Sequence, residues 1–262
     1  MRRHRALLTG IAVLLSGTLL FSSAMIWKEL SGRPKEKEEF SALAELVEAP
    51  EANPPVTSET PPAEADEPDE AAELRDLAPL FAQNGDCIGW LSIPGTQINY
   101  PVMHTPEEPQ KYLRRSFYGE YSQSGVPFLD WRCSLDSDNL IIYGHNMKNG
   151  SMFGTLRKFY EDEVYEKATY FWIYTPDKIY RYDIFSCAEV PVDSLAYQIT
   201  FSEEGSFEKY IDDAYSRSVV KGNDIKVTAE DKIVTLSTCT GNESTRFIVQ
   251  GKLSKTYWSK KK

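Results

Sequence analysis

Two β-type segments joined by a short polar turn, in KIVTLSTCTGNESTRFIVQGKLSK at residues 232–255, decide the fold expected of this chain. Both segments are rich in the β-branched and aromatic residues that favour strands. The connection, GNEST, contains the glycine, asparagine and serine that are common in turns. If the two strands are antiparallel neighbours, the turn brings Arg246 back beside Cys239, which ends the first strand.

Short strand-like segments recur before this hairpin, with turn signals between them. They are CIGWLSIPGTQINYPVM (87–103), GVPFLDWRC (125–133), DNLIIYGHN (138–146), and YFWIYTP with KIYRYDIFSCAEV (170–190), a hairpin around PDK. DNLIIYGHN has the continuous apolar run that is typical of a buried strand. Seven or eight short strands at roughly regular spacing predict a barrel or a sandwich.

Four further segments have a helical pattern and are expected at the periphery of the strands. Residues 107–117 and 151–170 are two of them. Residues 71–84 and 203–218 carry apolar residues at helical spacing, which are Leu74, Leu77, Leu80 and Phe81 in the first segment and Phe207, Tyr210, Ile211 and Tyr215 in the second. The sequence therefore predicts a mainly β fold with peripheral helices (α+β).

The N-terminus has a basic flank followed by a long uncharged run. RRHR at residues 2–5 precedes the 21 uncharged residues Leu7–Trp27, and about 20 apolar residues suffice to cross a bilayer. A cleaved signal peptide is the alternative, because FSSA at residues 21–24 resembles a cleavage site. The length of the run favours an uncleaved anchor. The basic flank then places the N-terminus in the cytoplasm and the rest of the chain outside.

Residues 31–75 differ in composition from the rest of the chain. They hold 13 Asp/Glu against 4 Lys/Arg, and seven of the fifteen prolines. Such a stretch buries too little apolar surface to offset its ordering entropy, so we expect an extended, disordered spacer. The chain is accordingly divided into a cytoplasmic leader with a transmembrane anchor (1–30), an acidic spacer (31–73) and a packed domain (74–262). Most of the net charge of −10 falls in the spacer, and no basic stripe with interleaved aromatics indicates nucleic-acid binding.

The four cysteines lie outside the membrane in this topology. They are sparse for an exported domain, and no CxxC spacing indicates a zinc site. Cys87, Cys133 and Cys187 are expected to be buried free thiols, with one disulfide among them as the alternative. Cys239 differs because it ends a strand, next to a turn.

A cysteine nucleophile needs a base, and the sequence offers three histidines. His4 lies in the cytoplasmic leader, and His104 lies in a proline-bounded turn where solvent exposure is the ordinary outcome. His145 follows the buried run LIIYG, and reactive side chains are commonly held at strand ends on a rigid scaffold. Taken by itself, His145 is also compatible with a structural role. Taken by itself, Arg246 is also compatible with a charge on the surface. Together with Cys239 they predict a catalytic site, in which a fixed guanidinium stabilises the oxyanion formed by attack on an amide carbonyl.

The combination of TLSTC, Arg246 in RFIVQGKL and the upstream IIYGHN resembles the sortases, the membrane-anchored cysteine transpeptidases of Gram-positive bacteria. The resemblance covers residues 74–258. GHNMKNGSMFGTLRKF and the helix before the cysteine strand are similar to the class B branch. The resemblance implies an eight-stranded β-barrel with an N-terminal helix and a helix inserted before the cysteine strand. It also implies Cys239 as the nucleophile, His145 as the general acid/base and Arg246 as the stabiliser of the oxyanion or the substrate.

Two further residues are expected to contact the substrate. Ser237 lies two positions from Cys239 and therefore shares its face of the strand, because successive side chains on a strand alternate. Tyr197 occupies the loop that covers the substrate groove in class B sortases, and the resemblance assigns it to substrate contact. A tyrosine that merely packs within the loop is the alternative.

The resemblance implies a two-step reaction that uses no metal and no other cofactor. Cys239 attacks the carbonyl of Thr in the C-terminal sorting signal of a surface protein or pilin, and protonated His145 supplies a proton to the departing amine. An amine of a lipid-linked peptidoglycan precursor or of a pilin then resolves the thioester. The enzyme is expected at the cell membrane, with its catalytic domain extracellular.

Three other classes of protein share part of this pattern. In a papain-like cell-wall peptidase the cysteine usually precedes the histidine and opens a helix, whereas here His145 comes first. In an L,D-transpeptidase the arginine follows the cysteine almost at once, whereas here seven positions separate them. An anchored wall-binding or pilus-assembly module with a merely buried Cys239 is the non-enzymatic alternative.

Overall fold

The computed structural model describes residues 2–47, 75–161, 165–166, 168–220 and 225–258, and within the first range it describes side chains only at 14–23, 25 and 35–47. The chain divides into two compact units, Met1–Ala42 and Leu43–Lys262. All of the strands belong to the second unit.

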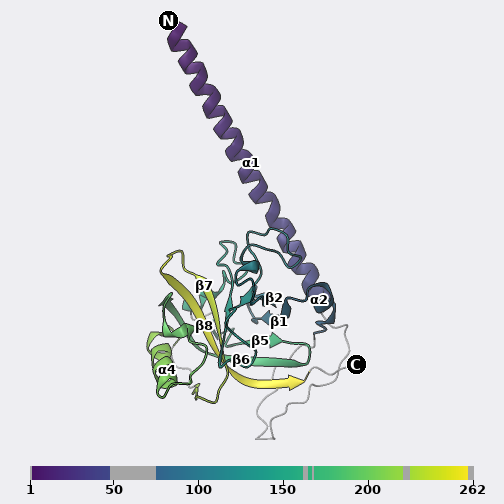
Figure 1. Cartoon of the computed structure of the whole chain (residues 1–262), viewed down its shortest axis with the longest axis vertical. Coiled ribbons are helices and arrows are strands. Elements are labelled where there is room, and N and C mark those ends of the chain that lie inside the picture. Colours follow the sequence, from purple (N-terminus) through teal and green to yellow (C-terminus); the bar gives the residue numbers. More distant parts are fainter. Residues whose placement is uncertain (1, 48–74, 162–164, 167, 221–224, 259–262) are drawn as a thin grey trace. The chain divides into compact units, whose positions relative to one another are not determined.

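The second unit is built on a closed barrel of eight strands in the order β1-β2-β3-β4-β7-β8-β6-β5 (Figure 1). The strands are β1 (Cys87–Ser92), β2 (Asn99–Met103), β3 (Phe128–Leu129), β4 (Asn139–Tyr143), β5 (Tyr170–Tyr174), β6 (Lys178–Pro191), β7 (Ile233–Cys239) and β8 (Thr245–Trp258). Neighbours are antiparallel except for two parallel pairs, β2 with β3 and β4 with β7. The predicted eight-stranded barrel is confirmed.

Strand β7 lies between β4 and β8, and this position explains why nearly the whole strand is buried. Every residue from Ile233 to Thr238 is buried, and Cys239 is exposed. The predicted antiparallel hairpin is confirmed, because β7 and β8 pair with Cys239 opposite Arg246. The parallel β4–β7 pair sets Tyr143 opposite Ser237. Parallel strands end at the same edge, so the residues that follow Tyr143 and Ser237 emerge together.

Helix α4 (Ser206–Arg217) precedes β7 and packs beside β6 (Figure 1). Its buried residues join Phe185 and Ile233 of the barrel in one apolar cluster, and they are Phe207, Tyr210, Ile211 and Ala214. Burying a side chain the size of Phe or Ile stabilises a fold by about 1.5–3 kcal/mol. The predicted amphipathic helix therefore packs its apolar face against the outside of the barrel.

The remaining helices are shorter than the sequence pattern predicts. Helix α2 is confined to Ala78–Gln83, and the 3-10 turns are η1 (Lys111–Leu113), η2 (Leu156–Tyr160) and η3 (Leu195–Tyr197). The helix predicted over 107–117 is wrong, because Pro109 disfavours helical backbone at the residue before it. The segment instead folds into turns, in which Glu108 N donates to Thr105 O and Lys111 N donates to Glu108 O.

Helix α1 runs from Arg2 to Val47, so residues 31–47 are helical where extended backbone is predicted. This part holds only Pro34 of the seven spacer prolines and is rich in Glu, Lys, Ala and Leu, which are strong helix formers. The other six prolines fall within 48–74, outside the described residues. In the part of the chain that the structure describes, no helix combines the length and the apolar character needed to cross a membrane. Much of the run from Leu7 to Trp27, where the anchor is predicted, has side chains outside that description.

Candidate active site

The ends of β4 and β7 bring His145 and Cys239 to one edge of the barrel. The hydrogen-bond ladder between β4 and β7 extends one residue beyond the end of β4, because Gly144 N donates to Ser237 O at 3.1 Å. His145 is therefore the first residue after this ladder on one strand, and Cys239 is the exposed end of the other. Two residues that are 94 positions apart thus leave adjacent strands at the same place.

The His145 ring is fixed by a backbone carbonyl. Its Nε2 lies 2.8 Å from Leu113 O. Since a carbonyl oxygen can only accept, Nε2 carries the proton, and in the neutral ring Nδ1 is the basic nitrogen. Burial lowers the pKa of His145; the bond to Leu113 opposes this shift, and the positive charge of Arg114 adds to it. The ring is therefore poised as a neutral base near pH 7.

Two side-chain bonds tie the turn that carries His145 to the end of the strand that carries Cys239, and a third reaches that end from η2. Thr238 Oγ1 donates to Gly144 O at 2.8 Å, and Asn146 Nδ2 donates to Cys239 O at 2.7 Å. Arg157 Nη1 donates to Thr240 O at 3.0 Å. These bonds fix the backbone on both sides of Cys239. Asn146 had no role assigned from the sequence, because its partner is 93 residues away and no local pattern points to it.

Arg246 lies opposite Cys239 in the β7–β8 hairpin, as the sequence predicts. Its Nη1 donates to three carbonyl oxygens of the turn, those of Asn242, Glu243 and Thr245. These bonds orient the guanidinium on the hairpin. Burial raises the pKa of Tyr197, and the hydrogen bond to Ser237 and the charge of Arg246 oppose that shift.

Ser237 and Tyr197 meet, but Ser237 does not present an open hydroxyl. The Tyr197 hydroxyl lies 2.8 Å from Ser237 Oγ, and Ser237 is only 1% exposed. Tyr197 also stacks on Tyr143 of β4, with ring centroids 6.4 Å apart. It lines a pocket of about 480 Å3 whose walls are Arg132, Tyr143, Val192, Asp193, Ser194, Leu195, Tyr197, Gln198 and Arg246. The structure thus places Tyr197 and Arg246 on one pocket, with Ser237 behind the tyrosine.

A buried amide holds the loop that carries Tyr197. Asn139 Nδ2 donates to Ala196 O at 3.1 Å and to Gln198 O at 2.9 Å, on either side of the tyrosine. Its Oδ1 accepts from Thr235 Oγ1 at 2.9 Å. Asn139 and Thr235 are fully buried, so water does not compete for these bonds. The loop position therefore depends on an amide that donates two protons and accepts one.

We predict that Asn139→Asp lowers the free energy of unfolding by about 2–5 kcal/mol, since a buried acceptor-only carboxylate would face two carbonyl oxygens. Release of the loop should also raise the KM for a peptide that contacts Tyr197. Urea unfolding and steady-state kinetics measure the two effects. Asn149→Asp is the matched control, because exposed Asn149 uses its Oδ1 as an acceptor, which aspartate retains. Equal behaviour of the two variants would contradict this role of Asn139.

The other three cysteines are buried free thiols, as the sequence predicts. Burial raises the pKa of Cys87 and of Cys133 to about 11 each, and it also raises the pKa of Cys187. Cys239 is the exposed cysteine. Across the described residues, no group of three His, Cys, Asp or Glu side chains is placed to hold a metal ion.

Comparison with known proteins places this chain in a family. A family model described as the sortase domain matches residues 91–254. Sortase B of Listeria monocytogenes is 37% identical over 186 residues, which cover 69% of this chain and 74% of that protein. The structure of sortase B from Bacillus anthracis superposes with a TM-score of 0.70 at 27% identity and covers 86% of this chain and 99% of that one. A substrate complex of Staphylococcus aureus sortase B gives a TM-score of 0.63 at 29% identity, over 68% and 83% of the two chains.

Proposed function

This chain belongs to the sortase family as a cysteine transpeptidase of the class B type, and we propose that Cys239, His145 and Arg246 carry out its reaction. The observation that carries this assignment is the convergence of His145 and exposed Cys239 at the ends of paired parallel strands. The three side-chain bonds around Cys239 support it, because a catalytic pair must be held in register.

In the first step, the Cys239 sulfur attacks the carbonyl carbon of the Thr residue in a sorting signal. Nδ1 of neutral His145 takes the thiol proton and then delivers it to the departing amine, so the peptide bond breaks as the thioester forms. The lowered pKa of His145 suits this role, because the imidazole is neutral before attack and readily gives up the proton afterwards.

We assign Arg246 to the oxyanion that forms during attack. A preorganised donor at that position can supply about 3–4 kcal/mol of transition-state stabilisation. The turn carbonyls that hold Nη1 supply the preorganisation. Tyr197 shares a pocket with Arg246 and is assigned to contact with the sorting signal, whereas Ser237 acts through the hydroxyl of Tyr197.

In the second step, the amine of a cell-wall precursor or of a pilin attacks the thioester, gives its proton to His145 and regenerates the thiol. The Staphylococcus aureus relative has been solved as a substrate complex, and by analogy we propose a sorting-signal peptide as the first substrate here.

A direct test is to incubate the purified protein with a peptide library of the form X-P-X-T-X, with glycine as the amine acceptor. The expected products are a peptide thioester on Cys239, detected by intact mass, and a new amide between Thr and glycine. An adduct on another cysteine, or cleavage at a residue other than Thr, would overturn the proposal.

We also propose that residues 7–27 anchor the enzyme in the cell membrane, with the catalytic domain outside. In α1 the large apolar side chains that are described within this run are 54–71% exposed, and they are Leu14, Leu15, Leu19, Leu20, Phe21 and Met25. Burial in lipid would remove this apolar surface from water.

The predicted outcome is that the full chain stays in the membrane pellet after carbonate washing and is released by detergent. Replacing residues 1–30 with a cleavable signal peptide should release the protein into the medium. Release of the natural chain after cleavage near residue 24 would instead show that this segment is a signal peptide.

A further inference from the structure

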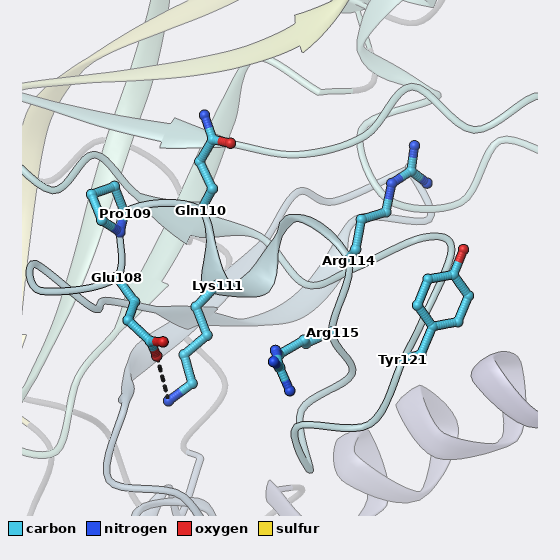
Figure 2. Close-up of a pocket in the computed structure, with 7 residues that line it drawn as sticks. All are labelled: Glu108, Pro109, Gln110, Lys111, Arg114, Arg115 and Tyr121. Carbon is cyan, nitrogen blue, oxygen red and sulfur yellow. Dashed lines mark ion pairs between the residues drawn. The ribbon is translucent and has the colours of Figure 1, made fainter.

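A pocket with cationic walls is formed by residues between 108 and 121. This segment includes Leu113, whose carbonyl oxygen contacts His145. The pocket has a volume of about 830 Å3 and is lined by Glu108, Pro109, Gln110, Lys111, Arg114, Arg115 and Tyr121 (Figure 2). Three of these residues are cationic and one is acidic. Such a concentration of positive charge marks a place where an anion would be attracted.

The charges of the two arginines are not neutralised within the described part of the chain. Lys111 Nζ pairs with Asp86 at 2.7 Å and with Glu108 at 3.6 Å, and Figure 2 shows the second pair. Arg114 and Arg115 instead donate Nη1 to neutral carbonyls, those of Gln123 at 2.6 Å and Gly119 at 3.0 Å.

Those carbonyl bonds orient each guanidinium and leave its charge intact. A planar guanidinium held in this way is suited to an oxyanion such as a carboxylate or a phosphate. Glu108 is exposed, and its pair with Lys111 is long, so an incoming anion can displace it at little cost. Figure 2 shows the Arg115 and Lys111 side chains on the same side of this segment, whereas the Arg114 guanidinium points away from both. Since Lys111 is also held by Asp86, the pocket offers an anionic group chiefly the guanidinium of Arg115, with Lys111 beside it.

The position of the pocket relates it to the second step of the reaction. Leu113 lies between Lys111 and Arg114 in the sequence, and its carbonyl accepts from His145 Nε2. The charge of Arg114 is felt at the His145 ring. The segment that forms the pocket is thus the one that orients the base which must deprotonate the incoming amine.

We propose that this pocket binds an anionic group, a phosphate or a carboxylate, on the amine acceptor that resolves the Cys239 thioester. The inference rests on the proposed transpeptidation and adds the chemistry by which the acceptor is selected. With the anion seated at residues 111–115, the amine end of the acceptor is held near His145.

The test compares acceptors that differ only in the anionic group. The first pair is triglycine and triglycine amide, and the second is O-phosphoethanolamine and ethanolamine. The kcat/KM for transfer is measured for each amine, and each value is divided by the rate of Cys239 acylation by the same protein. We expect the natural chain to prefer the anionic member of at least one pair by about tenfold, and the preferred pair distinguishes a carboxylate from a phosphate. The preference should weaken as salt is added.

Arg115→Gln should remove most of this preference, and Arg115→Lys, which retains the charge, should retain much of it. Lys209→Gln, at an exposed position on α4, is the matched control and should retain all of it. Equal rates within both acceptor pairs, or a preference that survives Arg115→Gln, would overturn the inference. An effect of Arg115→Gln on acylation alone would also overturn the inference, because the pocket would then bind the sorting-signal peptide. Absence of any thioester on Cys239 would instead refute the proposed function, and the inference with it.

Discussion

Replacing Cys239 with alanine will reduce cleavage of a sorting-signal peptide by about 10^4-fold or more, the loss expected when a covalent nucleophile is removed. The other thiols cannot substitute, because all three are buried. Burial also raises the pKa of Cys87, of Cys133 and of Cys187, which suppresses their thiolate forms. The measurement is the cleavage rate of a fluorogenic peptide, together with the intact mass of the enzyme.

Cys133→Ala is the matched control for this experiment. It removes a buried thiol whose Sγ lies 3.7 Å from Asn139 O, away from the exposed end of β7, and it should retain most of the activity. Thermal unfolding of both variants will show whether each is folded. Wild-type cleavage by Cys239→Ala would show that Cys239 is not the nucleophile. A thiol-reactive probe that labels Cys87 or Cys133 and spares Cys239 would argue the same way.

Replacing His145 with alanine is expected to reduce the acylation rate by about 10^2–10^4-fold, the usual contribution of a positioned acid–base group. The pH dependence tests the role more sharply than the loss of rate does. Burial lowers the pKa of His145, so the neutral base is retained as the pH falls to values below the ordinary histidine pKa of about 6.5. The acidic limb of the pH profile is the fall of the acylation rate toward low pH. It should therefore lie below pH 6.5 in the natural chain and should be absent from His145→Ala.

Arg114→Gln provides an independent check on this assignment. It removes the positive charge that adds to the lowering of the His145 pKa, so the acidic limb should move to higher pH. An acidic limb that stays in place in His145→Ala, or that moves to lower pH in Arg114→Gln, would contradict the assignment of His145 as the base. The profile is measured under single-turnover conditions, so that acylation is not masked by transfer.

The sequence predicted those parts of the site that depend on local pattern. The β7–β8 hairpin and the placement of Arg246 beside Cys239 follow from two β-type segments and a short turn, and the structure confirms that register. Helix α4 also follows from its own periodicity. In both cases the residues that determine the local structure lie close to one another in the sequence.

The parallel pairing of β4 with β7 could not be predicted from any local pattern. It joins segments that are more than ninety residues apart, and it alone brings His145 to Cys239. The roles of Asn146 and Asn139 were missed for the same reason, since their partners are distant carbonyls. The helix predicted at 107–117 is wrong for a local reason, because Pro109 prevents helical backbone within an otherwise helical pattern.

The β4–β7 pairing also links formation of the proposed catalytic pair to folding of the whole barrel. During synthesis β4 is made long before β7, and β7 pairs on its other side with β8, which is made last. Contacts of such long sequence separation form late in folding. Until the last strand is in place, His145 has no thiol beside it and Cys239 has no base, so an incomplete chain lacks the catalytic pair. The thiol of Cys239 therefore acquires its proposed base only when the barrel has closed.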